Sequence, residues 1–73
     1  MKNIVIELGE YKETAYVSDN YTITKERFIQ EIIDEVHEEE MMRYPEKSAE
    51  WRLSRLSKLE DKLMKKELKI KQL

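Results

Sequence analysis

The sequence is poor in the residues that build loops, disulfides and phosphate-binding turns. Among its 73 residues there are one glycine, one proline and no cysteine. Without cysteine the chain has neither a disulfide framework nor a thiolate metal site, so packing or association must stabilise the fold. A single glycine excludes the glycine-rich turn that brings backbone amides onto a pyrophosphate. So few chain-breaking residues predict long, uninterrupted helices and strands.

Long hydrophobic runs are also missing. The longest apolar stretch, Ile4 to Leu8, is interrupted by Glu7 and is too short for the apolar region of a signal peptide. No segment approaches the roughly 20 apolar residues that a membrane span needs. We therefore expect a soluble, cytoplasmic protein that makes no contact with a membrane.

Residues that could carry catalysis are scarce. The chain is long enough for one domain, residues 1–73, and chains of this size bury only about 60% of their unfolded surface. Such a thin core leaves little room to enclose a substrate. No cysteine nucleophile exists, and the only histidine, His37, lies in an acidic run. We expect no enzymatic activity, no small-molecule substrate and no cofactor.

Asp34 and His37 stand three residues apart, a spacing at which two side chains on a helix can reach one ion. Two ligands do not complete a metal shell, and the others would have to come from a second copy of the chain. We favour a solvated histidine on a charged helix face and predict no metal site.

Charge is distributed unevenly along the chain, although the net charge is only −2. Residues 1–50 contain 6 basic and 13 acidic side chains, which gives −7, whereas residues 51–73 contain 8 basic and 3 acidic ones, which gives +5. The two parts should attract each other. Either an acidic and a basic helix neutralise each other within the chain, or their charged faces point outward and meet partners.

Residues 1–20 have the pattern of a β-hairpin. Apolar side chains alternate along its first half, and Gly9 lies where the chain should reverse, since a glycine suits the first central position of a type II′ hairpin turn. A two-residue loop would pair Ile6 with Glu13, whereas a four-residue loop would pair Ile6 with Ala15. We favour the second register because it matches apolar partners, although both registers leave the same side chains on one face.

Residues 24–44 are predicted to form an acidic amphipathic helix. Thr24 is a suitable N-cap, because its hydroxyl can accept a hydrogen bond from a first-turn amide. Pro45 ends the helix by disfavouring helical dihedrals in the residue before it. The apolar side chains of this segment fall on one stripe, about 140° wide on a helical wheel. They are Phe28, Ile29, Ile32, Ile33 and Val36.

Residues 46–73 are predicted to form a second, basic amphipathic helix. Its apolar residues follow a spacing typical of a coiled coil, and the heptad set comprises Leu56, Leu59, Leu63, Ile70 and Leu73. Residues 67–71 also alternate with period two, so a short C-terminal strand beside the hairpin is the alternative. We favour the helix because Lys and Glu are good helix formers and no breaker separates this segment from the preceding one.

A helix over residues 46–73 is longer than its partner over residues 24–44. About seven residues, or roughly 10 Å of helix, would extend beyond the shorter one. This overhang leaves apolar side chains without a partner within the chain. We therefore expect a homo-oligomer that associates through Leu63, Ile70 and Leu73.

Together these segments predict an α+β fold, in which a β-hairpin packs on two long antiparallel helices in the order ββαα. An isolated hairpin is marginal in water, so its apolar face must pack on a helix. The expected core comprises Ile4, Ile6, Leu8, Val17, Phe28, Ile32, Ile33, Val36, Leu53, Leu56 and Leu63.

The main candidate site is the helix face opposite the apolar stripe of residues 24–44. It carries four carboxylates, followed by two methionines, whose flexible side chains suit adaptable contact surfaces. The candidate protein-binding residues are Glu31, Asp34, Glu35, Glu38, Met41 and Met42. We expect this face to bind a larger protein that presents a basic surface, as do small inhibitors or regulators encoded by phages and mobile elements.

Two other interpretations stay open. The basic helix over residues 46–73 could contact phosphates as a small nucleic-acid-binding regulator, and binding would then depend steeply on salt. We favour this less because acidic residues interrupt the basic run and the aromatic residues other than Trp51 lie elsewhere. In the other interpretation, the chain is a structural coiled-coil subunit that binds only itself.

Overall fold

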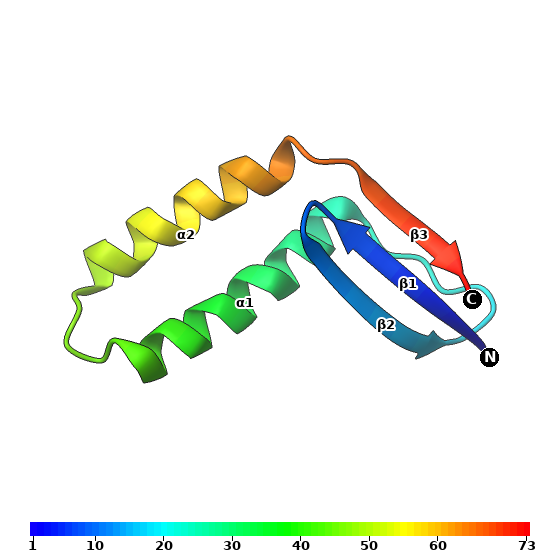
Figure 1. Cartoon of the computed structure of the whole chain (residues 1–73), viewed down its shortest axis with the longest axis horizontal. Helices are drawn as coiled ribbons and strands as arrows, with labels where there is room; N and C mark the ends of the chain where they lie inside the picture. Colours follow the sequence, from blue (N-terminus) through cyan, green and yellow to red (C-terminus); the bar gives the residue numbers. More distant parts are fainter.

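The computed structural model describes residues 1–73 as a three-stranded antiparallel sheet and a pair of antiparallel helices. Its elements are β1 (Lys2–Leu8), β2 (Tyr11–Val17), α1 (Lys25–Arg43), α2 (Ala49–Met64) and β3 (Leu68–Gln72). The sheet lies at one end of the molecule, and the helices form a hairpin that projects from it (Figure 1). The predicted α+β class and the order ββαα are confirmed, and a third strand follows them.

The β1–β2 connection is a two-residue turn, so the favoured four-residue register is wrong. Leu8 faces Tyr11 across the turn, and Ile6 pairs with Glu13. The turn closes this tightly because Gly9 adopts a φ of 59°, a left-handed conformation that glycine adopts at little cost. Glu10 does not share this positive φ, which agrees with the expected type II′ turn.

The sheet has one face covered by α1 and one open face. Ile4, Ile6 and Leu8 on β1 point toward α1 and are almost completely buried. Ala15 and Val17 of β2 share this inner face, as predicted, because the two candidate registers differ by an even number of residues. The open face carries Asn3, Val5 and Glu7 of β1, of which Val5 is shielded by its neighbouring strands.

Helix α1 closely matches the predicted helix over residues 24–44. The hydroxyl oxygen of Thr24 accepts a hydrogen bond from the Arg27 amide at 3.1 Å, which fixes the first turn. The helix ends at Arg43, two residues before Pro45. Along its apolar stripe Phe28, Ile29 and Ile32 are buried, and Ile33 and Val36 pack partly against the core.

Helix α2 is shorter than predicted at both ends. It begins at Ala49 rather than residue 46, because the Ser48 hydroxyl caps it by accepting the Trp51 amide at 3.1 Å. It ends at Met64, whose carbonyl oxygen accepts a hydrogen bond from the ammonium group of Lys25. A cation at this end also interacts favourably with the helix dipole. The predicted coiled-coil-like continuation to residue 73 is therefore wrong.

Residues 68–72 form β3, the alternative suggested by their period-two alternation. β3 pairs antiparallel with β1, with Ile6 opposite Ile70 and Leu8 opposite Leu68. The strand is preferred because β1 offers a second edge of unpaired backbone groups and because Leu68 can pack against the core. β1 thereby becomes the central strand in the order β2-β1-β3.

The core is a single cluster between the sheet and the helices. It consists of Ile4, Ile6, Leu8, Phe28, Ile29, Ile32 and Leu63. Leu56 on α2 is also buried, but Leu53 is wrongly assigned to the core, since it is 65% exposed. Leu53 lies on a flank of α2 that neither α1 nor the sheet covers.

Candidate protein-binding surface

The predicted acidic residues share one face of α1. Successive residues turn by about 100° in a helix, so Glu31, Asp34, Glu35 and Glu38 fall within an arc of roughly 100° opposite the buried stripe. We call these four residues the acidic face. The structure brings them together on one regular helix that Phe28 anchors to the sheet.

Few cations approach the acidic face. Arg27 lies 3.6 Å from Glu31 (Nε to Oε1), and the Gln30 amide donates to Asp34 at 2.9 Å. Glu35 and Glu38 have no basic group within 4.0 Å. The acidic face is therefore largely unpaired within the chain.

Met41 and Met42 follow the acidic face at the C-terminal end of α1. Met41 is 50% exposed and Met42 is 84% exposed. Their place on the helix continues the same outward side, since Met41 lies three residues after Glu38 and Met42 four residues after it. In Figure 1 this end of α1 lies at the tip of the helical hairpin, far from the sheet.

Glu40 occupies a different environment from the other acidic residues of α1. Its side chain is only 10% exposed, and both carboxylate oxygens accept from Nε of Arg55 on α2, at 3.2 and 3.1 Å. The guanidinium of Arg55 also stacks 4.7 Å from the centre of the Trp51 ring. Trp51 in turn meets Tyr44 edge-on at 5.5 Å, so it seals the corner between the helices.

The acidic side chains of α1 and the basic side chains of α2 are for the most part not paired with each other. Glu40–Arg55 is the one ion pair that joins α1 to α2. Lys62 of α2 reaches instead to Glu10 in the hairpin turn, at 3.2 Å. Of the two arrangements considered from the sequence, the outward-facing one describes the acidic face, while Glu40 belongs to the inter-helix contact.

Glu40 ends the acidic run that contains His37, and this composition hides its interior position in the sequence. Its position in the helical repeat indicates the interior location, because Glu40 lies four residues after Val36 and therefore on the apolar side of α1. Glu39 behaves differently, pairing with Arg43 on the exposed surface at 3.0 Å.

The residues expected to mediate self-association do not form one surface. Leu63 is buried in the core, so it cannot be part of an exposed coiled-coil face. Ile70 lies in β3 opposite Ile6, and Leu73 follows the strand, its amide donating to the Asn3 carbonyl at 2.9 Å. The helical overhang on which this expectation rested is therefore wrong.

The basic C-terminal segment is divided between two elements. Lys58 and Lys62 stay on α2, whereas Lys69 and Lys71 lie on the open face of the sheet. Lys71 and Lys12 flank Glu7 on that face, at 3.7 and 4.0 Å. The single basic helix expected over residues 46–73 is thus replaced by a short basic stretch on α2 and a mixed patch on the sheet.

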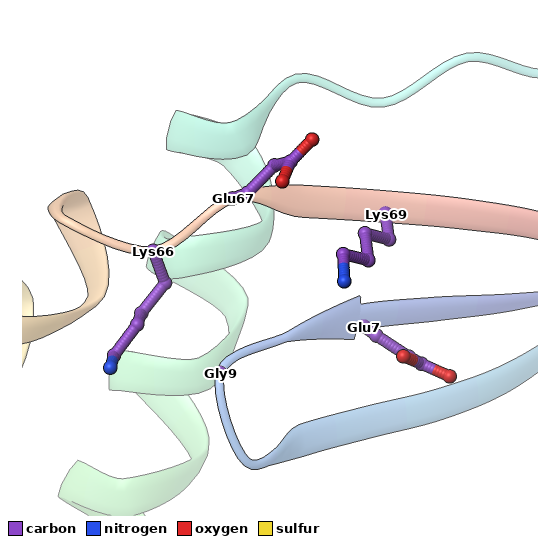
Figure 2. Close-up of a pocket in the computed structure, with 5 residues that line it drawn as sticks. All are labelled: Glu7, Gly9, Lys66, Glu67 and Lys69. Carbon is purple, nitrogen blue, oxygen red and sulfur yellow. The ribbon is translucent and has the colours of Figure 1, made fainter.

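A small hollow lies where the hairpin turn meets the connection between α2 and β3 (Figure 2). It measures about 200 Å³ and is lined by Glu7, Gly9, Lys66, Glu67 and Lys69, with no apolar side chain. The stem of Lys66 runs beside the turn, so a Cβ atom added at Gly9 would lie 3.3 Å from Cγ of Lys66.

No three His, Asp or Glu side chains gather in a way that could hold a metal ion. His37 is exposed on α1, between the acidic face and the stripe that packs on the core. Neither helix combines the length and apolar composition needed to cross a membrane. Comparisons of the chain with protein-family models, with curated proteins and with solved structures gave no match.

Proposed function

We propose that this chain is a non-catalytic protein-binding module that acts in the cytoplasm. In this proposal the acidic face, with Met41 and Met42, contacts a basic surface on a larger protein. The module would inhibit or regulate that protein, as small phage and mobile-element proteins do. The observation that carries the proposal is that Glu35 and Glu38 have no cation within 4.0 Å in the chain.

The position of the acidic face favours this use. Carboxylates left unpaired on a folded surface give a negative potential that attracts a basic partner and speeds encounter. The two exposed methionines add apolar area beside these charges, and a partner surface can adapt to their flexible side chains. In an interface of this kind the complementary charges contribute specificity, and the apolar contacts contribute affinity.

The test is affinity capture with the tagged full-length chain from a lysate of the source organism, with and without nuclease. Bound proteins are identified by mass spectrometry, and the triple substitution Glu31→Lys, Glu35→Lys, Glu38→Lys is compared with the wild type. We expect a stoichiometric partner that survives nuclease, elutes with salt and is lost from the variant.

A matched control carries Glu46→Lys, Glu60→Lys and Asp61→Lys, which change the net charge equally at other exposed positions. This control should retain the partner, and circular dichroism should show that both variants keep their helices. If both variants lose the partner equally, the contact depends on net charge alone and the acidic face is not the binding surface.

Nucleic-acid binding is the second candidate function, and one observation favours it. Lys12, Lys69 and Lys71 lie on the open face of the sheet together with Tyr16, which is 65% exposed. Lysines and an exposed aromatic ring are the components of a single-strand binding surface. The test is anisotropy of a labelled oligonucleotide at increasing salt, with Lys69→Ala, Lys71→Ala as the variant. Binding that is weak and unaffected by the variant would exclude this candidate.

A further inference from the structure

The outer edge of β2 has unpaired backbone groups at definite positions. Because Leu8 and Tyr11 flank a two-residue turn, they form a hydrogen-bonded pair, and such pairs alternate along an antiparallel ladder. Tyr11, Glu13, Ala15 and Val17 therefore direct their amides and carbonyls toward β1. The groups of the intervening residues point to the open edge; these residues are Lys12, Thr14 and Tyr16.

The opposite side of β1 supports this alternation independently. The carbonyl of Asn3 accepts the Leu73 amide at 2.9 Å, so the odd-numbered residues of β1 bond toward β3. The even-numbered residues are then the ones that bond toward β2. The residues with free backbone groups are therefore known for both edge strands, β2 and β3. In Figure 1 no other element lies beyond β2.

The free edge of β2 is complementary to itself. A two-fold axis through Thr14, perpendicular to the sheet, places Thr14 opposite Thr14 of a second copy and Lys12 opposite its Tyr16. Each of these residues then both donates and accepts a backbone hydrogen bond across the edge. On the inner face Tyr11 meets the second copy's Val17, an aromatic and β-branched pairing of the kind that stabilises sheets.

Charge and the length of the overlap together favour this register over its neighbours. About Thr14, the Glu13 carboxylate faces Ala15 of the second copy, and no like charges stand opposite each other. Shifting the axis to Glu13 or Lys12 would place two glutamates or two lysines directly opposite each other, and shifting it to Ala15 or Tyr16 would leave fewer residues of β2 paired. The Thr14 register is also the one with the longest overlap of β2 with itself.

The other edge of the sheet lacks this property. On β3 the free backbone groups belong to Leu68, Ile70 and Gln72. An axis through Ile70 would place Lys69 directly opposite Lys71 of the second copy, twice. Lysines in such positions are a known means of preventing edge-to-edge pairing. The chain therefore protects one edge by charge and leaves the other self-complementary.

We propose that two copies of this chain associate through antiparallel pairing of β2 with β2 about Thr14, which joins their sheets into one. The occupant of the β2 edge is thus a second copy of the chain rather than a strand of another protein. This association uses the backbone groups of β2, whereas the proposed function uses side chains of α1, so the two proposals are tested by different variants.

The experiment is sedimentation velocity over micromolar to millimolar concentrations. The wild type should reach the mass of a dimer, whereas Thr14→Lys, which brings two lysines together at the axis, should weaken dimerisation about tenfold or more. Gln72→Lys is the matched control, since it adds the same charge at the free edge of β3, and it should dimerise like the wild type. Circular dichroism and urea denaturation show whether the variants keep the monomer fold.

A mixing experiment gives the sharper outcome. Thr14→Lys and Thr14→Glu should each dimerise more weakly than the wild type when alone, but an equimolar mixture should form a heterodimer because opposite charges then meet at the axis. In the wild type, the amides of Lys12, Thr14 and Tyr16 should gain protection from hydrogen exchange as concentration rises. A wild type that stays monomeric throughout, or a dimer that Gln72→Lys disrupts and Thr14→Lys does not, would overturn the proposal.

Discussion

The Nε atom of Arg55 on α2 lies 3.2 and 3.1 Å from the two carboxylate oxygens of Glu40 on α1. This contact is the only ion pair between the two helices. The carboxylate is only 10% exposed, while Arg55 is half exposed and stacks on Trp51. Loss of the pair should therefore destabilise the fold more when Glu40 is left without Arg55 than when Arg55 is left without Glu40. A buried carboxylate without a partner has lost its hydration and gains nothing in return, whereas Arg55 still contacts water.

Arg55→Ala should lower the free energy of unfolding by about 1 to 3 kcal/mol, since it leaves Glu40 shielded from water without a partner. Urea denaturation measures this loss. Arg43→Ala is the matched control, because it removes the exposed pair with Glu39 and should cost less than about 1 kcal/mol. Equal losses in the two variants would show that the Glu40 contact is worth no more than a surface ion pair.

Leu53 and Leu56 give a direct test of which side of α2 faces the core. Leu56→Ala should destabilise the fold by about 2 to 5 kcal/mol, because it leaves a cavity at a buried position. Leu53→Ala should change stability by less than about 0.5 kcal/mol, because that side chain is already in water. Urea denaturation of both variants makes the comparison, and a larger loss at Leu53 would contradict the orientation of α2.

Features set by neighbouring residues were predictable from the sequence. The Thr24 cap, the inner face of the hairpin and the apolar stripe of α1 all depend on contacts or periodicities within a few residues. The common face of the acidic residues followed in the same way, because the phase of the stripe determines what lies opposite it. These are local relations, and no partner from a distant segment is needed to recognise them.

The parts that the sequence did not predict depend on distant segments. The local pattern of residues 67–71 fits both a helix and a strand, and the free edge of β1, which pairs with residues 60 or more positions later in the chain, decides between them. Leu53 fits the same leucine spacing as Leu56, and only the position of α1 and the sheet decides which flank of α2 is covered. The predicted hairpin register is wrong because the geometry of the Gly9 turn, and not the matching of apolar partners, sets which residues pair.

Gly9 should be the most sensitive position of the hairpin turn. Gly9→Ala places a Cβ at a φ of 59° and 3.3 Å from the Lys66 stem, so we expect a loss of about 1 to 3 kcal/mol in the free energy of unfolding. Glu10→Ala changes the other turn residue, whose φ is not positive, and removes only its exposed pair with Lys62. Urea denaturation should show little change for this control, and a Gly9→Ala variant as stable as the control would argue against the tight turn.

Amide hydrogen exchange should distinguish β3 from the helix that the sequence also allows. In the strand, Lys69 and Lys71 direct their amides toward Glu7 and Val5 of β1, whereas the amide of Ile70 faces the open edge. Exchange measured by NMR should therefore be slow at Lys69 and Lys71 and fast at Ile70. Because slow and fast amides alternate within one short segment, the amides of that segment serve as controls for one another. A helix would instead protect successive amides, because each bonds to the carbonyl four residues earlier. Uniform protection from residue 66 onward would show that α2 continues and that β1 has lost its second neighbour.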